Sequence, residues 1–219
     1  MGAGWIPPQF DDRREAGRIL AGHLAAELHG DGLVIGLARG GVVVAAEVAH
    51  ALGWPLDALA VRKVGHPVQP EYAIGAVTPD GGTTLRDPSG LSPDQLEQAV
   101  DAARAQAGDL DQRLHAARPA HSPAGRTCVL VDDGLATGAT MVAAVRWARA
   151  AGANSVVVAV PVGPPDTLAL LRTEADAALS LVAPVEMMAV GAWYRDFQQV
   201  SDEQVLALLD DAAAAGPTA

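Results

Sequence analysis

Residues 128–141 read Cys-Val-Leu-Val-Asp-Asp-Gly-Leu-Ala-Thr-Gly-Ala-Thr-Met, and this stretch decides the fold class that we expect. The continuous apolar run over 128–131 is typical of a strand that is buried on both faces. Apolar residues then recur at helical spacing over 141–151, and Gly152 is placed to end that helix. A buried strand that leads through a short loop into a helix predicts an α/β fold with a parallel sheet.

The polar groups at the end of this strand predict a binding site. Asp132 and Asp133 follow the strand directly, and carboxylates are strong acceptors for the vicinal hydroxyls of a ribose. The backbone N–H groups of residues 137–140 would point at a phosphate, helped by the positive end of the helix. The stretch lacks the Gly-Lys-Ser/Thr of a P-loop and the Gly-x-Gly-x-x-Gly of a dinucleotide site. We therefore expect a site for a phosphorylated sugar; the alternative is an ordinary buried strand with an acidic turn.

The same residues resemble the phosphoribosyl-pyrophosphate (PRPP) motif of type I phosphoribosyltransferases, in which an apolar strand, two acids and a small loop precede Thr-Gly-x-Thr. The resemblance follows the strand order over about residues 12–212 and is most specific over 129–140. It implies a Rossmann-like parallel sheet flanked by helices, with a small hood. Residues 62–77 and 191–205 also resemble a group of predicted bacterial phosphoribosyltransferases whose acceptor is unsettled.

The family resemblance implies an enzyme of nucleotide metabolism. Such an enzyme transfers 5-phosphoribose from PRPP to a nitrogenous base, purine-like or other, and releases pyrophosphate with Mg²⁺ as cofactor. A homodimer or other homo-oligomer is expected. Many purine members have an acid directly before the Thr-Gly, where this chain has Ala136, which weighs against a purine acceptor and leaves PRPP binding intact. Two alternatives stay open: a non-catalytic regulator that binds PRPP or a nucleotide, and a hydrolase of either ligand.

The resemblance also assigns roles to individual residues. The ribose-binding residues are Asp132 and Asp133, and the 5′-phosphate loop is Ala136, Thr137, Gly138, Ala139 and Thr140. The pyrophosphate-binding residues are Ala38, Arg39, Gly40, Gly41, Arg62 and Lys63. The base-binding residues are Met188, Trp193 and Tyr194, and the metal-binding residues, through water, are Asp132, Asp133 and Asp196. The expected catalytic residues are Asp133, Lys63 and Arg39.

Two of these assignments have an alternative interpretation, and a third implies a loop that moves. Ala38-Arg39-Gly40-Gly41 combines a guanidinium with glycines that let a phosphate approach the backbone, and the family often has a cis peptide here, between Ala38 and Arg39. The alternative is a glycine turn with a surface arginine. The polar stretch 62–71 is expected to be a loop that closes over PRPP, with His66 moving in it. The base-binding residues Met188, Trp193 and Tyr194 could instead pack the core of the hood.

Composition limits the class of partner. The net charge is −11, and nucleic-acid binding needs a basic face, so we expect no nucleic-acid partner. The single cysteine, Cys128, lies in the predicted central strand, where we expect an inert buried thiol, and the lack of any possible internal disulfide fits a reducing cytoplasm. No stretch has transmembrane length, and residues 1–10 lack the pattern of a signal peptide, so a cytoplasmic protein without a membrane partner is expected.

The pattern along the chain predicts one domain over residues 1–219, with a helical insert at about 86–125 and a hood segment at about 184–200. Helices are expected over 12–28, 42–52, 92–117, 141–151, 165–175 and 202–212. The first of these helices would have one apolar face made of Ala16, Ile19, Leu20, Leu24 and Leu28. Strands are expected over 33–37, 55–61, 72–77, 83–85, 128–131, 155–160 and 177–181, with a weaker one over 187–190. We expect an irregular arm over residues 1–10 and a frayed tail after Ala212.

Overall fold

A computed structural model of the chain describes residues 9–69, 72–86, 88 and 90–215. Its central sheet has five parallel strands in the order β2-β1-β6-β7-β8. The strands are β1 (Gly32–Leu37), β2 (Leu56–Leu59), β6 (Thr127–Val131), β7 (Ser155–Val162) and β8 (Ala177–Val182). Strand order reverses between β1 and β6, and in a sheet of this kind ligands bind beyond the carboxyl ends of the strands at such a reversal.

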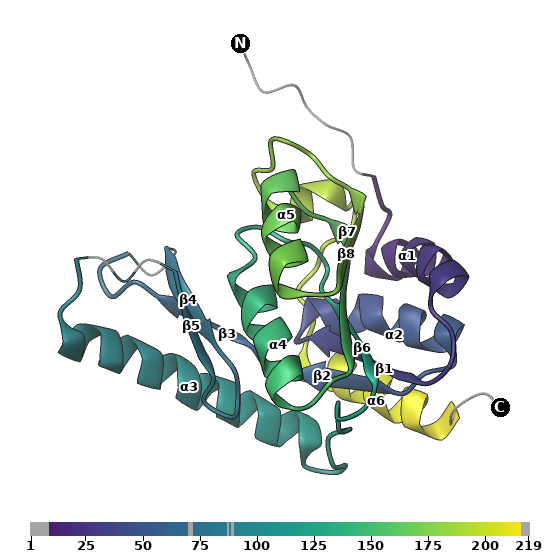
Figure 1. Cartoon of the computed structure of the whole chain (residues 1–219), viewed down its shortest axis with the longest axis horizontal. Coiled ribbons are helices and arrows are strands. Elements are labelled where there is room, and N and C mark those ends of the chain that lie inside the picture. Colours follow the sequence, from purple (N-terminus) through teal and green to yellow (C-terminus); the bar gives the residue numbers. More distant parts are fainter. Residues whose placement is uncertain (1–8, 70–71, 87, 89, 216–219) are drawn as a thin grey trace.

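Helices cover both faces of this sheet (Figure 1). On one face lie α1 (Arg13–Glu27), α2 (Gly40–Leu52) and α6 (Asp202–Ala215), and on the other lie α4 (Ala139–Ala150) and α5 (Pro165–Glu174). Alternate residues of β6 serve the two layers, because successive side chains of a strand point to opposite faces. Val129 and Val131 pack in the layer of α1 and α2, whereas Cys128 and Leu130 pack in the layer of α4 and α5.

The predicted inert thiol is confirmed by its surroundings. Cys128 is free and fully buried in the central strand. Burial raises the pKa of this thiol to about 11, so it stays protonated at neutral pH.

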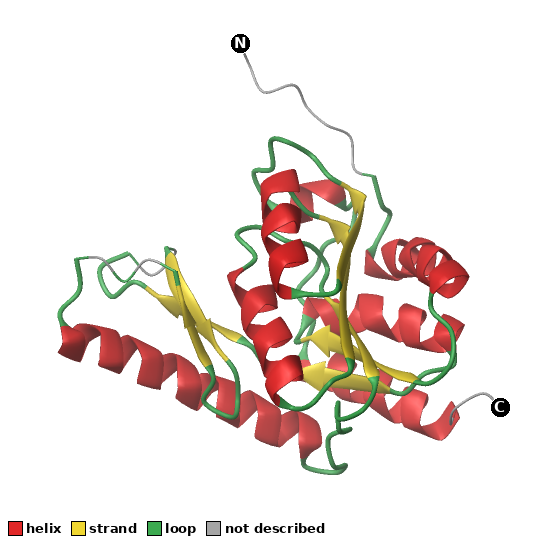
Figure 2. Cartoon of the chain, viewed as in Figure 1, coloured by secondary structure: helices red, strands yellow, loops and turns green. Residues whose placement is uncertain are grey.

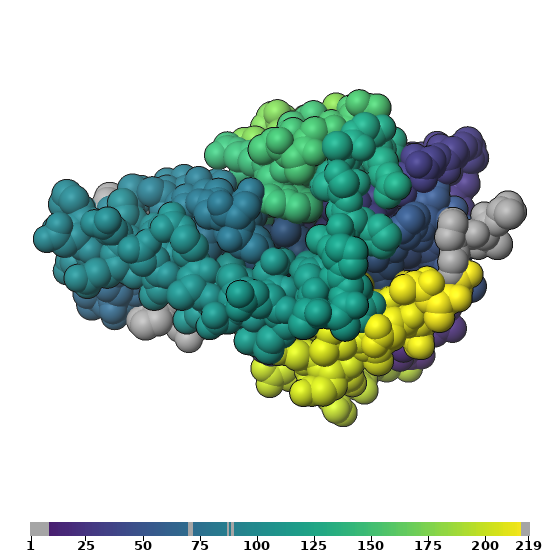
Figure 3. Space-filling view, turned by 90° about the horizontal axis from the view of Figure 1, so that it is seen from below, coloured from purple at the N-terminus to yellow at the C-terminus, as the bar shows by residue number. Residues whose placement is uncertain are grey.

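A second, smaller body projects from the sheet (Figure 2). It consists of an antiparallel sheet, β3 (Arg62–Gly65), β4 (Ala73–Val77) and β5 (Thr83–Leu85), covered by the long helix α3 (Pro93–His115). We call this body the arm. Its core is the cluster of Val64, Ile74, Val77, Ala103 and Ala107. Viewed from below, the far end of α3 lies beside α6 (Figure 3), where Arg113 pairs with Asp202 at 3.0 Å.

The helix start in the arm follows the predicted capping pattern. Ser92 accepts a hydrogen bond from the backbone of Gln95, whose side chain accepts one from the backbone of Ser92, and Pro93 stands in the first turn. The long helix expected over 92–117 is confirmed as α3, which packs on the antiparallel sheet, and the bounds of the insert at about 86–125 stay a prediction.

The expectation of a loop over 62–71 was wrong in its first part. Residues 62–65 form β3, which pairs antiparallel with β4, and Val64 is fully buried under α3. The strand is held by β4, which begins about ten residues later in the chain, and by α3, which begins about thirty residues after β3. Neither contact can be recognised from the polar sequence of residues 62–65 alone. Position 71, taken as the far end of the loop, lies outside the described residues.

Two further expectations were wrong. The segment 187–190 is no strand: Val190 instead begins a 3-10 helix, η1 (Val190–Trp193), and Met188 is 93% exposed, so the segment buries too little to join the sheet edge. Ile19 was placed on the apolar face of α1 but is 41% exposed, because the contact face is centred on Gly17, which packs against Glu47 of α2.

The chain ends are described only in part. Residues 1–8 of the irregular N-terminal stretch expected over 1–10, and residues 216–219 of the expected C-terminal tail, lie outside the described residues. Phe10 is buried against Tyr194 of the hood segment (residues 184–200). Within the described ranges, none of the helices combines the length and apolar character that crossing a bilayer requires.

Candidate functional site

A cavity of about 580 Å³ opens at the carboxyl edge of β1 and β6. Its walls come from the ends of these strands, the start of the arm, the loop before α4 and the hood segment. The lining residues are Arg13, Leu37, Ala38, Val61, Arg62, Lys63, Asp132, Asp133, Gly134, Leu135, Ala136, Thr137, Gly138, Thr140, Val190 and Phe197. Most residues predicted to bind PRPP therefore face one cavity.

The acidic pair lies at the floor of this cavity, directly after β6. Asp132 Oδ1 accepts a hydrogen bond from the backbone N–H of Asp133 at 2.9 Å, and Asp133 Oδ2 accepts one from Arg13 Nε at 2.7 Å. Each carboxylate thus uses one oxygen within the protein. Among the described residues, no hydrogen bond reaches the second oxygen of either carboxylate, so a pair of vicinal hydroxyls would find two acceptors there.

Burial dominates the electrostatics of the pair. It raises the pKa of Asp132 well above its usual range, and the charge of Asp133 raises it further, while the backbone N–H of Asp133 and the cation of Lys63 act in the opposite direction. Burial also raises the pKa of Asp133, against the lowering effect of Arg13. Two carboxylates held this close in a desolvated site favour a ligand that brings donors or positive charge.

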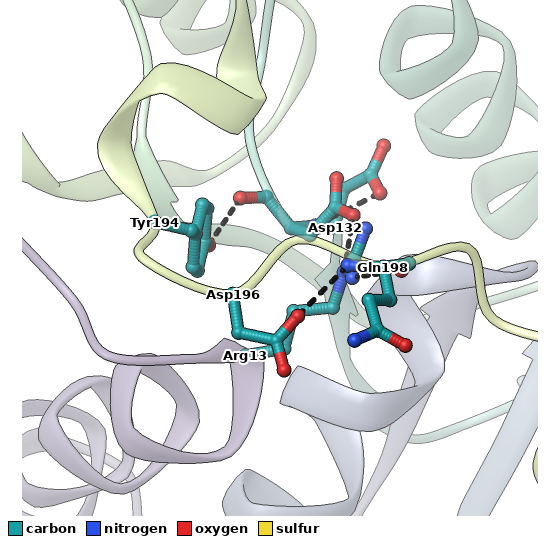
Figure 4. A network of polar contacts seen from close by, with 6 residues as sticks. Arg13, Asp132, Tyr194, Asp196 and Gln198 are labelled. Carbon is teal, nitrogen blue, oxygen red and sulfur yellow. Dashed lines mark hydrogen bonds and ion pairs between the residues drawn. The ribbon is translucent and has the colours of Figure 1, made fainter. Parts of the chain in front are cut away.

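The backbone of the pair is fixed from the hood. The hydroxyl of Tyr194 donates to the backbone carbonyl oxygen of Asp133 at 2.6 Å (Figure 4). Burial and the charge of Asp133 raise the pKa of Tyr194, so its hydroxyl stays protonated and keeps donating at any physiological pH. The hood segment therefore holds the backbone of Asp133, although Tyr194 lies about sixty residues after Asp133 in the chain.

The loop before α4 forms a second wall. Gly138 has φ 75°, a conformation that favours glycine, and no side chain caps the first turn of α4. The first N–H groups of a helix need partners, and an uncapped N-terminus beside a cavity is suited to an anion. From outside, Thr167 Oγ1 donates to Ala136 O at 2.9 Å and Arg86 donates to Thr137 O. These two bonds fix the orientation of the loop.

The turn before α2 lies behind the acidic pair. The peptide between Ala38 and Arg39 is cis, as the resemblance implied. A Cβ on Gly40 would lie 2.1 Å from Asp133 Oδ2, and a Cβ on Gly41 would lie 2.8 Å from Asp132 Cα. Both glycines are therefore required by the packing of the aspartates, whatever they contribute to a ligand, and of this turn Ala38 lines the cavity.

The three cations predicted to bind pyrophosphate differ in their surroundings. Arg39 points to α6, where its Nε donates to Asp202 Oδ1 at 2.5 Å. Arg62 and Lys63 line the cavity, and the buried Nε of Arg62 has no hydrogen-bond partner within the described part of the chain. Burial, together with the charges of Arg39 and Arg113, lowers the pKa of Arg62. The charge of Asp202, which pairs with both of those arginines, acts in the opposite direction.

The residues predicted to bind the base do not gather in the cavity. Met188 projects into solvent, whereas Trp193 and Tyr194 are buried in the hood core with Phe10 and Val162. Their role in base binding stays a prediction. The apolar side chains that line the cavity are instead Leu135, Val190 and Phe197, with Leu37 and Val61.

The described residues hold no group of three or more His, Cys, Asp or Glu side chains that could bind a metal by themselves. Asp196, predicted as a water-mediated ligand, lines a neighbouring groove rather than the cavity. The free carboxylate oxygens of Asp132 and Asp133 are hard donors that suit Mg²⁺, which usually takes one or two carboxylates and completes its shell with water and phosphate oxygens. The donor set therefore fits Mg²⁺ held largely by a substrate.

Several site residues were not foreseen from the sequence. Arg13 lies in the helix predicted over 12–28 and Phe197 in the hood segment predicted over about 184–200, and neither pattern indicates a role at the site. Asp202 was read as the first residue of the last helix, yet it pairs with both Arg39 and Arg113. These residues come from opposite ends of the chain, and no local pattern marks them.

Comparison with known proteins gives consistent results. Residues 12–187 match the phosphoribosyl transferase domain family. Two curated proteins of Mycobacterium tuberculosis, which carry the provisional name phosphoribosyl transferase, are each 48% identical over 208 residues, or 93% of this chain. That match covers 47% of each relative, so the chain spans about half the length of these curated relatives.

Among solved structures, the crystal structure of TT1426 from Thermus thermophilus is similar to this chain with a TM-score of 0.79 and 43% identity. The match covers 93% of this chain and 98% of that chain. The arrangement of sheet, helices and arm is thus shared with a protein known from experiment.

Proposed function

The chain belongs to the phosphoribosyl transferase family, and from that premise we propose that it transfers 5-phosphoribose from PRPP to a nitrogenous base and releases pyrophosphate. The observation that carries the proposal is the pairing of two features across one cavity. The acidic pair offers one free oxygen on each carboxylate, and the uncapped start of α4 faces it. A ribose 5-phosphate has hydroxyls and a phosphate to match these two features.

The proposed pose follows from these features. The 2′- and 3′-hydroxyls of the ribose donate to the free oxygens of Asp132 and Asp133. The 5′-phosphate lies on the loop of Thr137, Gly138 and Thr140, where backbone N–H groups and the end of the α4 dipole attract an anion.

The diphosphate then lies on the wall formed by Arg62 and Lys63. Both residues line the cavity, and cations of this kind bind phosphate oxygens. Arg39, expected to be catalytic, contributes here only if it leaves Asp202.

In the proposed reaction, the bond between C1 of the ribose and the diphosphate oxygen breaks and a bond between C1 and a nitrogen of the base forms. The diphosphate leaves with the electron pair of the broken bond. Positive charge develops on the sugar, close to the carboxylates of Asp132 and Asp133, while negative charge develops on the leaving group beside Arg62 and Lys63. Mg²⁺, when bound with PRPP, neutralises charge on the diphosphate. We further propose that residues 66–69, the described part of the stretch after β3, limit access of water to the sugar.

The residue at position 136 limits which bases could act as the acceptor. Ala136 lines the cavity and offers no carboxylate there to take a proton from the base. We therefore propose an acceptor whose reacting nitrogen carries no proton or loses it readily. Walls made by Leu135, Val190 and Phe197 suit a flat ring, because apolar side chains pack against its faces.

The test is pyrophosphate release from PRPP and Mg²⁺ with a panel of purines, pyrimidines and pyridine carboxylic acids. Base-dependent release, with a nucleotide product seen by mass spectrometry, is the expected result. Release without any base would identify a hydrolase. Tight PRPP binding without release would instead favour a regulator that binds PRPP without turnover. Absence of PRPP binding would contradict the proposal altogether.

The second candidate is a regulator that binds PRPP or a nucleotide without turnover, and Ala136 is the observation that favours it. Both candidates use the same cavity. A homo-oligomer and a cytoplasmic location stay predictions from the sequence.

A further inference from the structure

One guanidinium connects three segments at the rim of the cavity. Arg13, the first residue of α1, donates from Nε to Asp133 Oδ2 at 2.7 Å and from Nη1 to the backbone oxygen of Gln198 at 2.8 Å. Its Cζ atom lies 3.7 Å from the centre of the Phe197 ring. Figure 4 shows Arg13 lying between the acidic pair and the hood segment.

The position of Arg13 in its own helix argues that this contact is not incidental. Cations are unfavourable in the first turn of a helix, where the dipole is positive, so Arg13 weakens α1 unless it is compensated. The carboxylate of Asp133 compensates it in a nearly buried pair, with side chains 11% and 15% exposed. An ion pair in such a site is screened little by solvent and holds its geometry.

The pair also fixes what Asp133 can do. Because Arg13 holds one oxygen of the carboxylate, rotation about the side chain is restricted, and the other oxygen stays presented to a ligand. The same guanidinium fixes Gln198 and covers one face of Phe197, which lines the cavity. Only arginine, with several donors in a rigid planar group, can serve both acceptors and the ring together.

We propose that Arg13 is a positioning residue for ribose: it orients Asp133 toward the sugar hydroxyls and ties the hood segment to that carboxylate. The inference rests on the proposed function, since it concerns the ribose of the same ligand. It predicts that loss of Arg13 weakens binding of the sugar and leaves binding of the diphosphate intact, because Arg62 and Lys63 lie on another wall.

The experiment compares Arg13→Met, Arg13→Lys and Arg14→Met by calorimetry with two probes, ribose 5-phosphate and inorganic pyrophosphate. Arg14 is the matched control, since it follows Arg13 in the chain and pairs with Glu47 on the surface at 3.1 Å, away from the cavity. Arg13→Met should weaken ribose 5-phosphate by about tenfold and pyrophosphate by less than about twofold. Arg13→Lys should recover part of the loss, and Arg14→Met should bind both probes as the wild type does.

Three outcomes would overturn the inference. They are unchanged affinity of Arg13→Met for ribose 5-phosphate, an equal loss for both probes, and an equal loss in Arg14→Met. Should Arg13→Met fail to fold, Phe197→Leu keeps the ion pair but removes the ring under the guanidinium, and should weaken ribose 5-phosphate by about two- to fivefold; unchanged binding in that variant would also overturn it. Failure of the proposed function is distinguishable, because the wild type itself would then bind neither ribose 5-phosphate nor PRPP.

Discussion

Two of the helices that begin near the cavity have no side-chain cap on the first turn among the described residues: α2 at Gly40 and α4 at Ala139. The start of α4 is lined by Gly138 and Thr140 and opens to the cavity. The start of α2 is covered, because Asp133 lies so close to Gly40 that a Cβ there would be 2.1 Å from its carboxylate oxygen. The start of α4 thus lines the cavity, whereas the Asp133 carboxylate of the protein itself lies against the start of α2.

The two turns before α2 and α4 show how similar local sequences can have different partners in the folded protein. Both turns consist of small residues before a helix, and both ends attract negative charge through the helix dipole. At α2 the neighbouring strand β6 leads into the acidic pair, and the carboxylate of Asp133 packs against Gly40. At α4 no side chain arrives, so the N–H groups stay available. The partner of each helix end is set by the packing around it and not by the turn itself.

The largest effect expected from this comparison follows from Gly40→Ala. The added methyl group would collide with Asp133 Oδ2 and lie 3.0 Å from Arg13 Nε, so the acidic pair must move. We expect a loss of about 2–4 kcal/mol in the free energy of unfolding and at least about a hundredfold loss of PRPP affinity. Denaturant unfolding and calorimetry measure the two effects.

Gly108→Ala is the matched control for this substitution. Gly108 lies inside α3, and a Cβ there meets nothing within 4 Å among the described residues. It should stabilise the protein by about 0.5–1 kcal/mol through helix propensity and leave PRPP binding unchanged. Normal PRPP affinity in Gly40→Ala would show that the turn does not support the aspartates.

The second effect concerns stability and has opposite signs at the two neighbouring acids. Asp132→Asn removes a buried charge and keeps an acceptor for the N–H of Asp133, so we expect the ligand-free protein to gain about 1 kcal/mol. Asp133→Asn leaves Arg13 nearly buried without its carboxylate, and should cost about 2–4 kcal/mol. Equal effects at both positions would contradict the asymmetry of the pair.

The pH dependence of the free energy of unfolding tests the burial of Asp132 in the wild-type protein. Its pKa is higher in the folded state than in the unfolded chain, so the folded state binds more protons between the two values. In metal-free buffer, stability should therefore fall as the pH rises from the ordinary carboxyl range through the raised pKa. This part of the slope should be absent in Asp132→Asn, as followed by thermal unfolding.

A third, smaller effect separates the two predicted pyrophosphate cations. Lys63 lines the cavity, whereas Arg39 pairs with Asp202 outside it. We expect Lys63→Met to weaken pyrophosphate by about tenfold and Arg39→Met by less than about threefold. The reverse order would mean that Arg39 leaves Asp202 when the ligand binds, and it would give α2 a direct part in anion binding.

The smallest effect is expected for the contact between the arm and the loop before α4. Arg86, which follows β5, donates to the carbonyl oxygen of Thr137 on that loop. Arg86→Met should weaken binding of ribose 5-phosphate by about two- to fivefold, because an exposed hydrogen bond contributes about 0.5–1 kcal/mol. A loss above tenfold would instead indicate that Arg86 binds the phosphate itself.

The start of α4 and the acidic pair could be predicted from the sequence because their determinants are local. Strand, acids and loop lie within residues 128–141, and the structure places them at one cavity. The parallel sheet was predictable for a similar reason, since each strand is a short apolar run between helical patterns. The capping box at Ser92 belongs to the same class.

The rest depends on contacts between distant segments. β3 is held by β4 and α3, so its polar sequence gave no sign of a strand. Arg13 meets Asp133 across 120 residues, and Arg39 meets Asp202 across 163. Met188, exposed, and Trp193, buried, show that the composition of the hood segment does not reveal which of its side chains reach the cavity. These contacts follow from the tertiary fold, which no single stretch encodes.

The most direct test of the account is calorimetric titration of PRPP with Mg²⁺ into the wild type and Asp132→Asn, compared with thermal unfolding of both. The account predicts clear binding by the wild type and at least about a hundredfold weaker binding by the variant, which nevertheless unfolds at the same or a higher temperature. Equal PRPP affinity of the two proteins would contradict it, since the ribose would then be held without that carboxylate.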